Sequence, residues 1–599
     1  MQQKRLLLAL LISVVILTVW SYFFVKPQQP PTSGQTGSTA TPSPATSEPP
    51  NPSATATPAS NATPTPIGAS TPWAEPQRLV VVKTPLYEAK IDSRGAEVVS
   101  WIVKKNKNSG RDIHSVAGSK TSPQPLELVS AEGLKRQPRQ APLQVVTGDN
   151  SLDATLAGNN YSIQGAESSS GDVEVNLSGS EEKTISFFYQ DPSTGLSVLK
   201  TLAFAANAYT VDLELKIDRG GQAVPAKLKL GPSIGDQGIK HYTFYSVAPE
   251  GIASIGAKVE RHTAPSINEN KSSPDHLSLP GPVDWGGVGD TYFAMVAIPS
   301  KPLEGLEFST VQYDFNPNGK PEKRYITEAY VPVATDGSKT IVYIGPKDHF
   351  ILTEDSQQIG QEIGRTIDLE GLIDYGWFTW LSRPIAVPIL KAIRWLHQLT
   401  NSYGVAIILF TIVIYSLFFP LKWRSSKAMK KAQKLAPRMK ELQEKIKGMK
   451  QNDPRLKELQ MEQLRLMKEG NPLGGCLPLL IQMPFLFALY RAITISLDFR
   501  QATFLWLPDL SAGDPLHILE FLMAGTMIVL QLITPAPSAD PMQRKMMAIG
   551  MPLFMLYVLW GAPSGLLVYW LVGNIVGFSQ QFIINRLTQT DGDAVPAKT

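Results

Sequence analysis

Long runs of apolar residues dominate the two ends of this sequence. One run occupies residues 6–25, and five more lie in the last third of the chain. A helix rises about 1.5 Å per residue, so the 20 residues of the first run make about 30 Å of helix, which spans the hydrocarbon core of a bilayer. The later stretches cover about residues 403–421, 473–497, 516–533, 546–560 and 564–584. We therefore predict a membrane protein with six spans.

The first run is predicted to be an uncleaved membrane anchor, residues 1–26. A cleavable signal peptide is the alternative, but the run is long for a signal-peptide core and no small-x-small cleavage site directly follows it. Lys4 and Arg5 precede the run, and the positive-inside rule places such residues in the cytoplasm. The chain after Lys26 is therefore expected outside, which in a bacterium is the periplasm.

Residues 27–77 have the composition of a disordered linker. They contain 13 prolines among 51 residues, the rest are mainly Ser, Thr, Ala and Gln, and only Glu48 and Glu75 are charged. Such a segment buries too little apolar surface to offset the entropy lost on ordering. We expect an extended tether between the anchor and the next folded domain.

Residues 78–355 are predicted to form a periplasmic, mainly antiparallel β-sandwich. Short runs rich in β-branched and aromatic residues alternate with Gly, Pro, Asn, Asp and Ser, which is typical of strands joined by turns. The clearest runs are residues 79–83, 87–91, 98–103, 184–189, 209–217, 226–230, 292–298 and 340–344. The chain has one cysteine, Cys476, which excludes an internal disulfide framework and a metal site built from several cysteines.

Residues 356–400 are predicted to contain an amphipathic helix that lies at the membrane interface. Apolar residues recur at helical spacing, and three basic residues are expected on the water-facing side: Lys391, Arg394 and His397. Pro384 and Pro388 are expected to interrupt the helix. The tryptophans suited to headgroup depth are Trp377, Trp380 and Trp395. A core helix of the sandwich is the alternative interpretation.

The distribution of charge predicts how the later spans alternate. Residues 422–470 carry 15 basic and six acidic residues, whereas the only basic residue in 498–515 is Arg500. The positive-inside rule places the first segment in the cytoplasm and the second outside. We predict a five-span α-helical bundle over residues 401–585, with both chain ends and the tail 586–599 in the cytoplasm. The net charge is only +4, so a surface for an anionic partner must be local.

The segment 422–470 is predicted to be a cytoplasmic hairpin of two antiparallel amphipathic helices. Leucine and methionine recur at helical spacing on both sides of a break at residues 448–454. Its cations suit docking onto ribosomal RNA or lipid headgroups. An ordinary solvated hairpin is the alternative. The cations expected to bind the partner are Lys427, Lys430, Lys431, Lys434, Arg438 and Lys440.

Several motifs occur in a specific order in the last third of the chain. The first is Asn471-Pro472-Leu473-Gly474-Gly475-Cys476-Leu477-Pro478-Leu479-Leu480-Ile481-Gln482-Met483-Pro484, whose glycines and prolines predict a kinked, closely packing helix entry. It is followed by Ser511-Ala512-Gly513-Asp514-Pro515, Asp540-Pro541-Met542-Gln543 and Pro563-Ser564-Gly565-Leu566, which leads to Tyr569 and Asn574. With these motifs the chain resembles the YidC/Oxa family of membrane protein insertases, in particular the bacterial branch with a large periplasmic domain. The resemblance covers the last 240 residues strongly and the layout of the first 355.

The resemblance implies an insertase and chaperone of the bacterial inner membrane rather than an enzyme. It implies that hydrophobic segments of nascent proteins move from the cytoplasm into the bilayer through a polar groove, alone or with the Sec translocon. The implied partners are nascent membrane proteins, the ribosome, the Sec translocon and the lipid bilayer, with no cofactor, metal or small-molecule substrate. The resemblance also implies a supersandwich-like fold for the periplasmic domain, and a likeness of fold transfers no activity.

Polar side chains within the predicted spans are candidates to line such a groove. Polar groups are disfavoured in lipid and therefore face protein or water. In a groove they would hydrate the polar part of a substrate and shorten the apolar barrier. Hydrogen bonds between helices, of about 0.6 kcal/mol each, are the alternative. The candidates are Thr411, Tyr415, Ser416, Gln482, Thr526, Gln531, Tyr569, Trp570 and Asn574.

One position departs from the family pattern. The family usually carries an arginine five residues before the proline of its second span, where this chain has Tyr415 before Pro420. Arg491 in the third span is a candidate groove cation that would replace the arginine. The helical spacing favours the other interpretation, in which Arg491 snorkels to the outer interface near Asp498.

Two other classes of function compete with an insertase. Residues 231–235 match the G-x-S-x-G pattern of hydrolases, but the sequence after them does not predict the helix that a nucleophile elbow needs. No H-E-x-x-H motif and no phosphate-binding loop occur. The main alternative is a transporter or channel with a periplasmic ligand-binding domain, although the spans show no repeated halves and no acidic relay residues.

Overall fold

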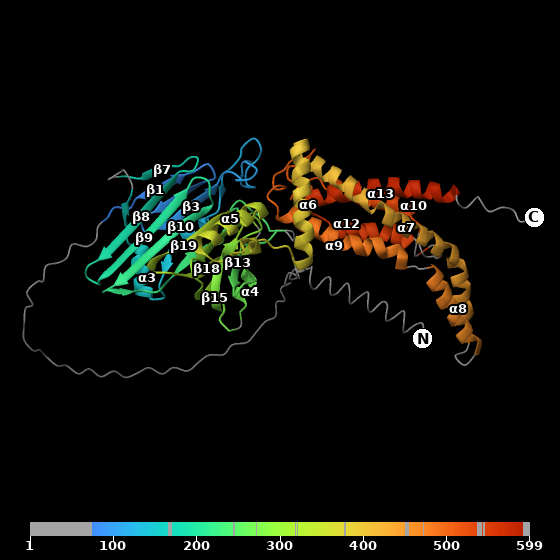
Figure 1. The fold of residues 1–599 in the computed structure, drawn as a ribbon, viewed down its shortest axis with the longest axis horizontal. Coiled ribbons are helices and arrows are strands. Elements are labelled where there is room, and N and C mark those ends of the chain that lie inside the picture. The colour runs from blue at the N-terminus through green and yellow to red at the C-terminus, as the bar shows by residue number, and fades with distance from the viewer. Residues whose placement is uncertain are drawn as a thin grey trace, which may run out of the picture. The chain divides into compact units, whose positions relative to one another are not determined.

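The structure is a computed structural model, shown in Figure 1. It describes residues 75–165, 171–242, 246–270, 272–317, 319, 321–376, 379–449, 454–470, 473–535, 542 and 545–590, with side chains omitted at 454, 470, 473–481 and 588–590. The predicted anchor, nearly all of the predicted linker, the end of the tail and Trp377 lie outside the described residues. All described residues belong to one compact unit, Ser70–Thr599.

A five-stranded sheet begins the described chain. Its strand order is β4-β3-β2-β1-β7, and the pairs are antiparallel except for the parallel pair of β1 with β7. The strands are β1 (Leu79–Lys83), β2 (Tyr87–Asp92), β3 (Glu97–Val103), β4 (Leu126–Glu127) and β7 (Val173–Asn176). In its core the ring of Tyr87 stacks on Trp101 with centroids 4.4 Å apart, and both residues are fully buried.

A larger antiparallel sheet holds 14 described strands, and Figure 1 shows its long strands β8, β9, β10 and β19 side by side. Its main path runs β5-β12-β18-β17-β15-β16-β19-β10-β9-β8-β6, while β11 pairs with β10 and the β13–β14 hairpin joins β15. The bounds are β5 (Val145–Val146), β6 (Ser162–Gln164), β8 (Glu182–Asp191), β9 (Leu196–Ala205), β10 (Thr210–Arg219), β11 (Gln222–Ala223), β12 (Ala226–Leu230), β13 (Glu250–Ile255), β14 (Lys258–Thr263), β15 (His276–Gly289), β16 (Phe293–Pro299), β17 (Leu303–Phe315), β18 (Glu322–Val333) and β19 (Asp336–Pro346).

Alternation of side chains explains why these segments form strands. In β9 every second residue is buried, starting from Leu196, because one face of the strand packs on the core. Each of the eight runs singled out in the sequence overlaps one strand. The prediction of a β-rich domain is therefore confirmed. Four short helices accompany the strands: α2 (Ala131–Lys135), α3 (Asn150–Gly158), α4 (Ala264–Asn268) and α5 (His349–Ile363), followed by the 3₁₀ helix η1 (Leu369–Leu372).

Helix α6 (Thr379–Thr400) is continuous, so the predicted interruption at Pro384 and Pro388 was wrong. Its inner side buries Ile389 and Ile393. Trp380 and Trp395 are exposed, as a helix at a membrane interface requires.

Helix α7 (Tyr403–Lys447) runs without a break for 45 residues, through Pro420 and Pro437. The sequence indicated a span ending near residue 421 and a separate hairpin helix after it; the structure joins the two into one rod. Helix α8 (Pro454–Gly470) follows. Figure 1 shows α8 beside the far end of α7.

The remaining helices are strongly apolar. They are α9 (Leu473–Ile495), α10 (Ile518–Ile533), the π-helical turn η2 (Met546–Gly550) with α12 (Met551–Val558), and α13 (Ser564–Thr590). Among the described residues, two helices are long and apolar enough by themselves to cross a membrane, Tyr403–Lys447 and Ser564–Leu587. Two shorter apolar helices are Ile518–Ile533 and Met546–Val558. The C-terminal region is therefore helical and partly suited to lipid.

Candidate functional site

Polar side chains from three apolar helices meet at Tyr415. The Nε2 of Gln482 on α9 donates a hydrogen bond to the Tyr415 hydroxyl oxygen at 3.4 Å. The Tyr415 ring meets the ring of Tyr569 on α13 edge to face, with centroids 6.1 Å apart. Phe485, one turn after Gln482, also contacts Tyr569, with centroids 6.4 Å apart. Three of the nine groove candidates therefore converge from α7, α9 and α13.

A second pair of candidates joins α13 to α10. The Nδ2 of Asn574 donates to the Thr526 hydroxyl oxygen at 3.1 Å and to the Met523 carbonyl oxygen at 3.2 Å. The Thr526 hydroxyl itself donates to the Leu522 carbonyl oxygen within α10. Since Asn574 is buried, these contacts work as interhelical hydrogen bonds, the alternative role considered for this set.

The other candidates do not join either group. Thr411 and Ser416 donate to carbonyl oxygens one turn earlier in α7, those of Ile407 and Ile412. Thr411 is fully buried and Ser416 is exposed. Gln531 and Trp570 are half-buried. The nine candidate side chains therefore range from fully buried to exposed.

The structure adds a residue that the sequence analysis did not select, Lys422. Its Nζ donates to the carbonyl oxygen of Gly577 on α13 at 2.8 Å. Nearby, Gln580 Nε2 donates to the Tyr415 carbonyl oxygen at 2.9 Å. Lys422 follows Tyr415 by seven residues and so lies on the same side of α7. This spacing could have identified Lys422 from the sequence, where it contributes only to the positive charge that predicts the topology.

Arg491 does not reach the convergence at Tyr415. Its Nη2 pairs with the Asp374 carboxylate at 2.6 Å and also contacts the Asp374 carbonyl oxygen. Burial acts to raise the pKa of Asp374, but Arg491 and Arg261 outweigh it and hold that pKa below its usual value. The expectation that Arg491 lies near Asp498 was wrong, because Asp374 supplies its carboxylate, and nothing in this geometry makes it a groove cation.

Asp498 is instead bound by Arg394, which was expected to face water. Arg394 bridges two carboxylates, at 2.9 Å from Asp498 and 3.1 Å from Asp348. Asp348 also caps α5 by accepting the backbone N–H groups of Phe350 and Ile351. The expectation that Arg394 faces water was wrong, because Asp348 and Asp498 are buried and an unpaired buried carboxylate is strongly disfavoured.

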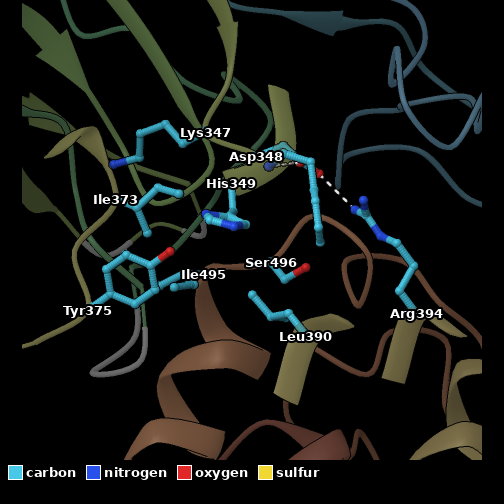
Figure 2. A pocket seen from close by; sticks show the side chains of 10 residues that line it. Lys347, Asp348, His349, Ile373, Tyr375, Leu390, Arg394, Ile495 and Ser496 are labelled. Atoms are coloured by element: carbon cyan, nitrogen blue, oxygen red, sulfur yellow. Dashed lines mark hydrogen bonds and ion pairs between the residues drawn. The ribbon is translucent and has the colours of Figure 1, made fainter. Parts of the chain in front are cut away.

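Figure 2 shows the cavity beside this ion pair. Lys347, His349, Tyr375 and Ser496 are among the side chains that line it. Burial and the neighbouring Arg261 lower the pKa of Lys347 to about 8. The cavity volume is about 10 Å³, the space of a single water molecule. This junction therefore supports the fold and cannot hold a substrate.

The predicted hairpin is antiparallel. Arg438 of α7 pairs with Glu462 of α8 at 3.0 Å, and Lys431, seven residues earlier, pairs with Glu469, seven residues later, at 3.6 Å. Lys427 lies 5.5 Å from the centre of the Trp423 ring. The remaining candidate cations are Lys430, half-buried, and Lys434 and Lys440, both exposed. Partial burial and the charge of Lys434 lower the pKa of Lys430.

The G-x-S-x-G segment does not form a nucleophile elbow. The Ser233 hydroxyl donates to the Tyr325 carbonyl oxygen at 3.0 Å and accepts the Thr327 N–H at 2.9 Å. Residues 234–242 contain no helix. The hydroxyl is therefore committed to the backbone of β18.

Two family models match adjacent parts of this chain. The model described as YidC periplasmic domain matches residues 79–388, and the model described as 60Kd inner membrane protein matches residues 395–591. The chain belongs to the YidC family of membrane protein insertases. The YidC family is an inner-membrane family with a periplasmic domain, and it is not an enzyme family.

Named relatives agree along the whole length. Membrane protein insertase YidC of Citrifermentans bemidjiense is 33% identical and covers 98% of this chain and 99% of its own. The YidC of Syntrophus aciditrophicus is 31% identical over 97% of this chain and 99% of its own. A crystal structure of an active YidC insertase with its first transmembrane domain resolved is 18% identical, covers 85% of this chain and 94% of its own, and has a TM-score of 0.31.

Proposed function

We propose that this YidC family insertase moves its substrates along a polar surface formed by α7, α9, α10 and α13. The observation that carries the proposal is the meeting of Gln482, Tyr415 and Tyr569 from three helices within apolar sequence. A hydroxyl or amide that a substrate can approach replaces part of its lost hydration. The half-buried candidates outside the Asn574–Thr526 pair, Tyr415, Gln482, Gln531 and Trp570, form the accessible part of that surface.

The arrangement in the membrane follows from the helices and their charges. The spans are α7 up to about residue 421, α9, α10, the pair η2 and α12, and α13. The basic part of α7 and α8 lies in the cytoplasm with both chain ends, and the β-rich domain lies in the periplasm. This topology gives the substrate an entry from the cytoplasmic side.

Partitioning into lipid supplies the driving force. A segment of about 20 apolar residues gains several kcal/mol on entering lipid, because each central Leu or Ile contributes a few tenths. The protein lowers the kinetic barrier for the polar flank of that segment. No nucleotide hydrolysis is needed.

The hairpin of α7 and α8 is the proposed docking surface for the ribosome. Its exposed cations, Lys427, Lys434 and Lys440, suit the phosphate backbone of ribosomal RNA. The Sec translocon is a second proposed partner, which would pass hydrophobic segments to the bundle.

Reconstitution of the purified full-length protein in liposomes tests the insertase function. A small single-span substrate should become protease-protected without nucleotide. Photo-crosslinkers at Tyr415, Gln482 and Trp570 should capture a stalled nascent chain, whereas one at the lipid-facing Leu417, 70% exposed, should not. Solute flux without insertion would instead favour the transporter alternative.

A further inference from the structure

Two glycines of α13 admit polar side chains of α7 into the helix contact. A Cβ at Gly573 would lie 2.3 Å from the Tyr415 hydroxyl oxygen, and a Cβ at Gly577 would lie 3.2 Å from Lys422 Nζ and 3.3 Å from Leu530 Cδ2. Gly573 and Gly577 are one turn apart, the spacing that lets helices approach closely in membranes. The Lys422 ammonium therefore lies between α7, α13 and α10.

Lys422 points the unusual way for a lysine at the end of a span. Such lysines normally extend toward water, but this one binds the carbonyl oxygen of Gly577. Gly577 lies within α13, about 20 Å along the helix from its first residue, Ser564. An ammonium has three donors, and among the described residues only the one to Gly577 is used. No acidic side chain in the described chain pairs with it.

Gln580, three residues after Gly577, supplies a hydrogen-bond acceptor, in contrast to the donors of Lys422. Its Nε2 donates to the Tyr415 carbonyl oxygen, which fixes the orientation of the amide. The residue is 8% exposed, and its Oε1 accepts no hydrogen bond in the described structure. An unsatisfied buried acceptor is costly and needs a partner.

The two side chains complement a peptide group. Its carbonyl oxygen matches the spare donors of Lys422, and its N–H matches Gln580 Oε1. A carboxylate would satisfy the lysine but would leave the glutamine without a donor. We infer that Lys422 and Gln580 form a site that binds backbone peptide groups in the extended, polar flank of an inserting segment.

The site deepens the proposed insertase function and depends on it. A polar flank in extended conformation carries unpaired N–H and C=O groups, each disfavoured by several kcal/mol in hydrocarbon. Recognition of the backbone would relieve this penalty whatever the side chains of the flank. Specificity would then lie in the apolar segment that follows.

Liposomes containing the full-length protein test the site with one single-span substrate that has three versions of its translocated flank. The flanks are Ser/Ala-rich, the same with alternate prolines, and the same with aspartates. Lys422→Met should slow insertion of the Ser/Ala flank about tenfold and Gln580→Leu about threefold, as expected for losing a charged and a neutral hydrogen bond. Proline has no N–H to donate to Gln580. The Gln580→Leu variant should therefore insert the substrate with the proline flank as fast as the wild-type protein inserts that same substrate.

Controls separate this site from general damage and from the insertase function itself. Lys391→Met removes an exposed lysine of α6 that lies outside the groove and the hairpin and should leave insertion unchanged. Lys422→Arg, which keeps the donors, should restore most of the insertion rate. Wild-type rates in both Lys422→Met and Gln580→Leu would overturn the site while leaving the insertase intact. A Lys422→Met defect confined to the aspartate flank would also overturn it, in favour of a carboxylate site. Failure of the wild-type protein to insert any substrate would refute the proposed function first.

Discussion

Arg500 Nη2 lies 2.5 Å from the Asp236 carboxylate, and the two side chains are 4% and 2% exposed. The pair joins the loop after α9 to the β-rich domain, 264 residues away in sequence. Arg111 reinforces the same loop by donating to the carbonyl oxygens of Leu497 at 2.9 Å and Asp498 at 2.8 Å. The C-terminal end of α9 is therefore held by the β-rich domain.

Breaking this pair from one side should destabilise the protein strongly. Asp236→Ala leaves a buried guanidinium without its carboxylate, and such changes cost about 3–5 kcal/mol. Thermal unfolding of the purified protein in detergent would measure the loss. The double variant Asp236→Leu with Arg500→Met should recover only part of the loss, because the Asp236 carboxylate also accepts hydrogen bonds from the Ser115 hydroxyl and the Val116 N–H. Equal losses in the single and double variants would contradict this account.

Gly573→Ala should disturb the helix contact at Tyr415. The added methyl group would lie 2.3 Å from the Tyr415 hydroxyl oxygen and 2.5 Å from its Cζ, so the ring or the helix must shift, at about 1–3 kcal/mol. Gly525→Ala is the matched control, because a Cβ there meets nothing within 4 Å. Adding Tyr415→Ala should rescue Gly573→Ala in the same unfolding assay. No rescue would show that the strain lies elsewhere.

The Asp355 carboxyl should make stability fall as pH rises. Burial raises its pKa to about 6 from 3.8, partly opposed by Lys107. The folded protein then binds this proton more tightly than the unfolded chain, so the contribution is present below about pH 4 and is lost as pH rises through 6. Asp355→Asn should reduce the dependence of the unfolding free energy on pH in that window. An unchanged profile would count against a raised pKa.

Arg491→Ala should lower stability without changing the intrinsic insertion rate. The arginine pairs with Asp374 rather than with Tyr415 or Gln482, so its loss leaves a half-buried carboxylate and costs roughly 1–3 kcal/mol. Unfolding measurements and insertion rates normalised to folded protein would separate the two effects. A lower normalised rate would restore Arg491 as a groove cation.

Neutralising Lys427, Lys434 and Lys440 together should weaken ribosome binding and reduce its dependence on salt, because fewer counterions are released from RNA. Lys431 and Arg438 already pair with Glu469 and Glu462, so changing them to glutamine should have a smaller effect for each charge removed. Sedimentation of ribosomes with the protein at several salt concentrations would measure both. Equal effects per charge removed in the two sets would point to net charge alone.

The sequence predicted the parts of the fold that depend on local pattern. Alternation of apolar residues marked strands such as Leu79–Lys83 and Ala226–Leu230 with the bounds that the structure has. It missed short strands such as Val145–Val146, because two residues carry no periodicity. It also expected separate elements around Pro420, whereas packing keeps α7 continuous there.

The site was harder to predict because it depends on contacts between distant residues. Polarity within apolar runs selected Tyr415, Gln482 and Tyr569, which lie together. The partner of Arg491 could not be read from spacing, since Asp374 precedes it by 117 residues. Lys422 was overlooked because a lysine at the end of a span usually marks topology, and only the contact with Gly577 reveals its inward direction.

The length of α7 has a mechanical consequence. At about 1.5 Å per residue its 45 residues extend about 68 Å, and the same rod carries Tyr415 near one end and Arg438 near the other. Because no loop separates the two parts of this helix, a force that displaces the hairpin also displaces Tyr415. Pro420 and Pro437 lie inside this helix and are positions where it can bend.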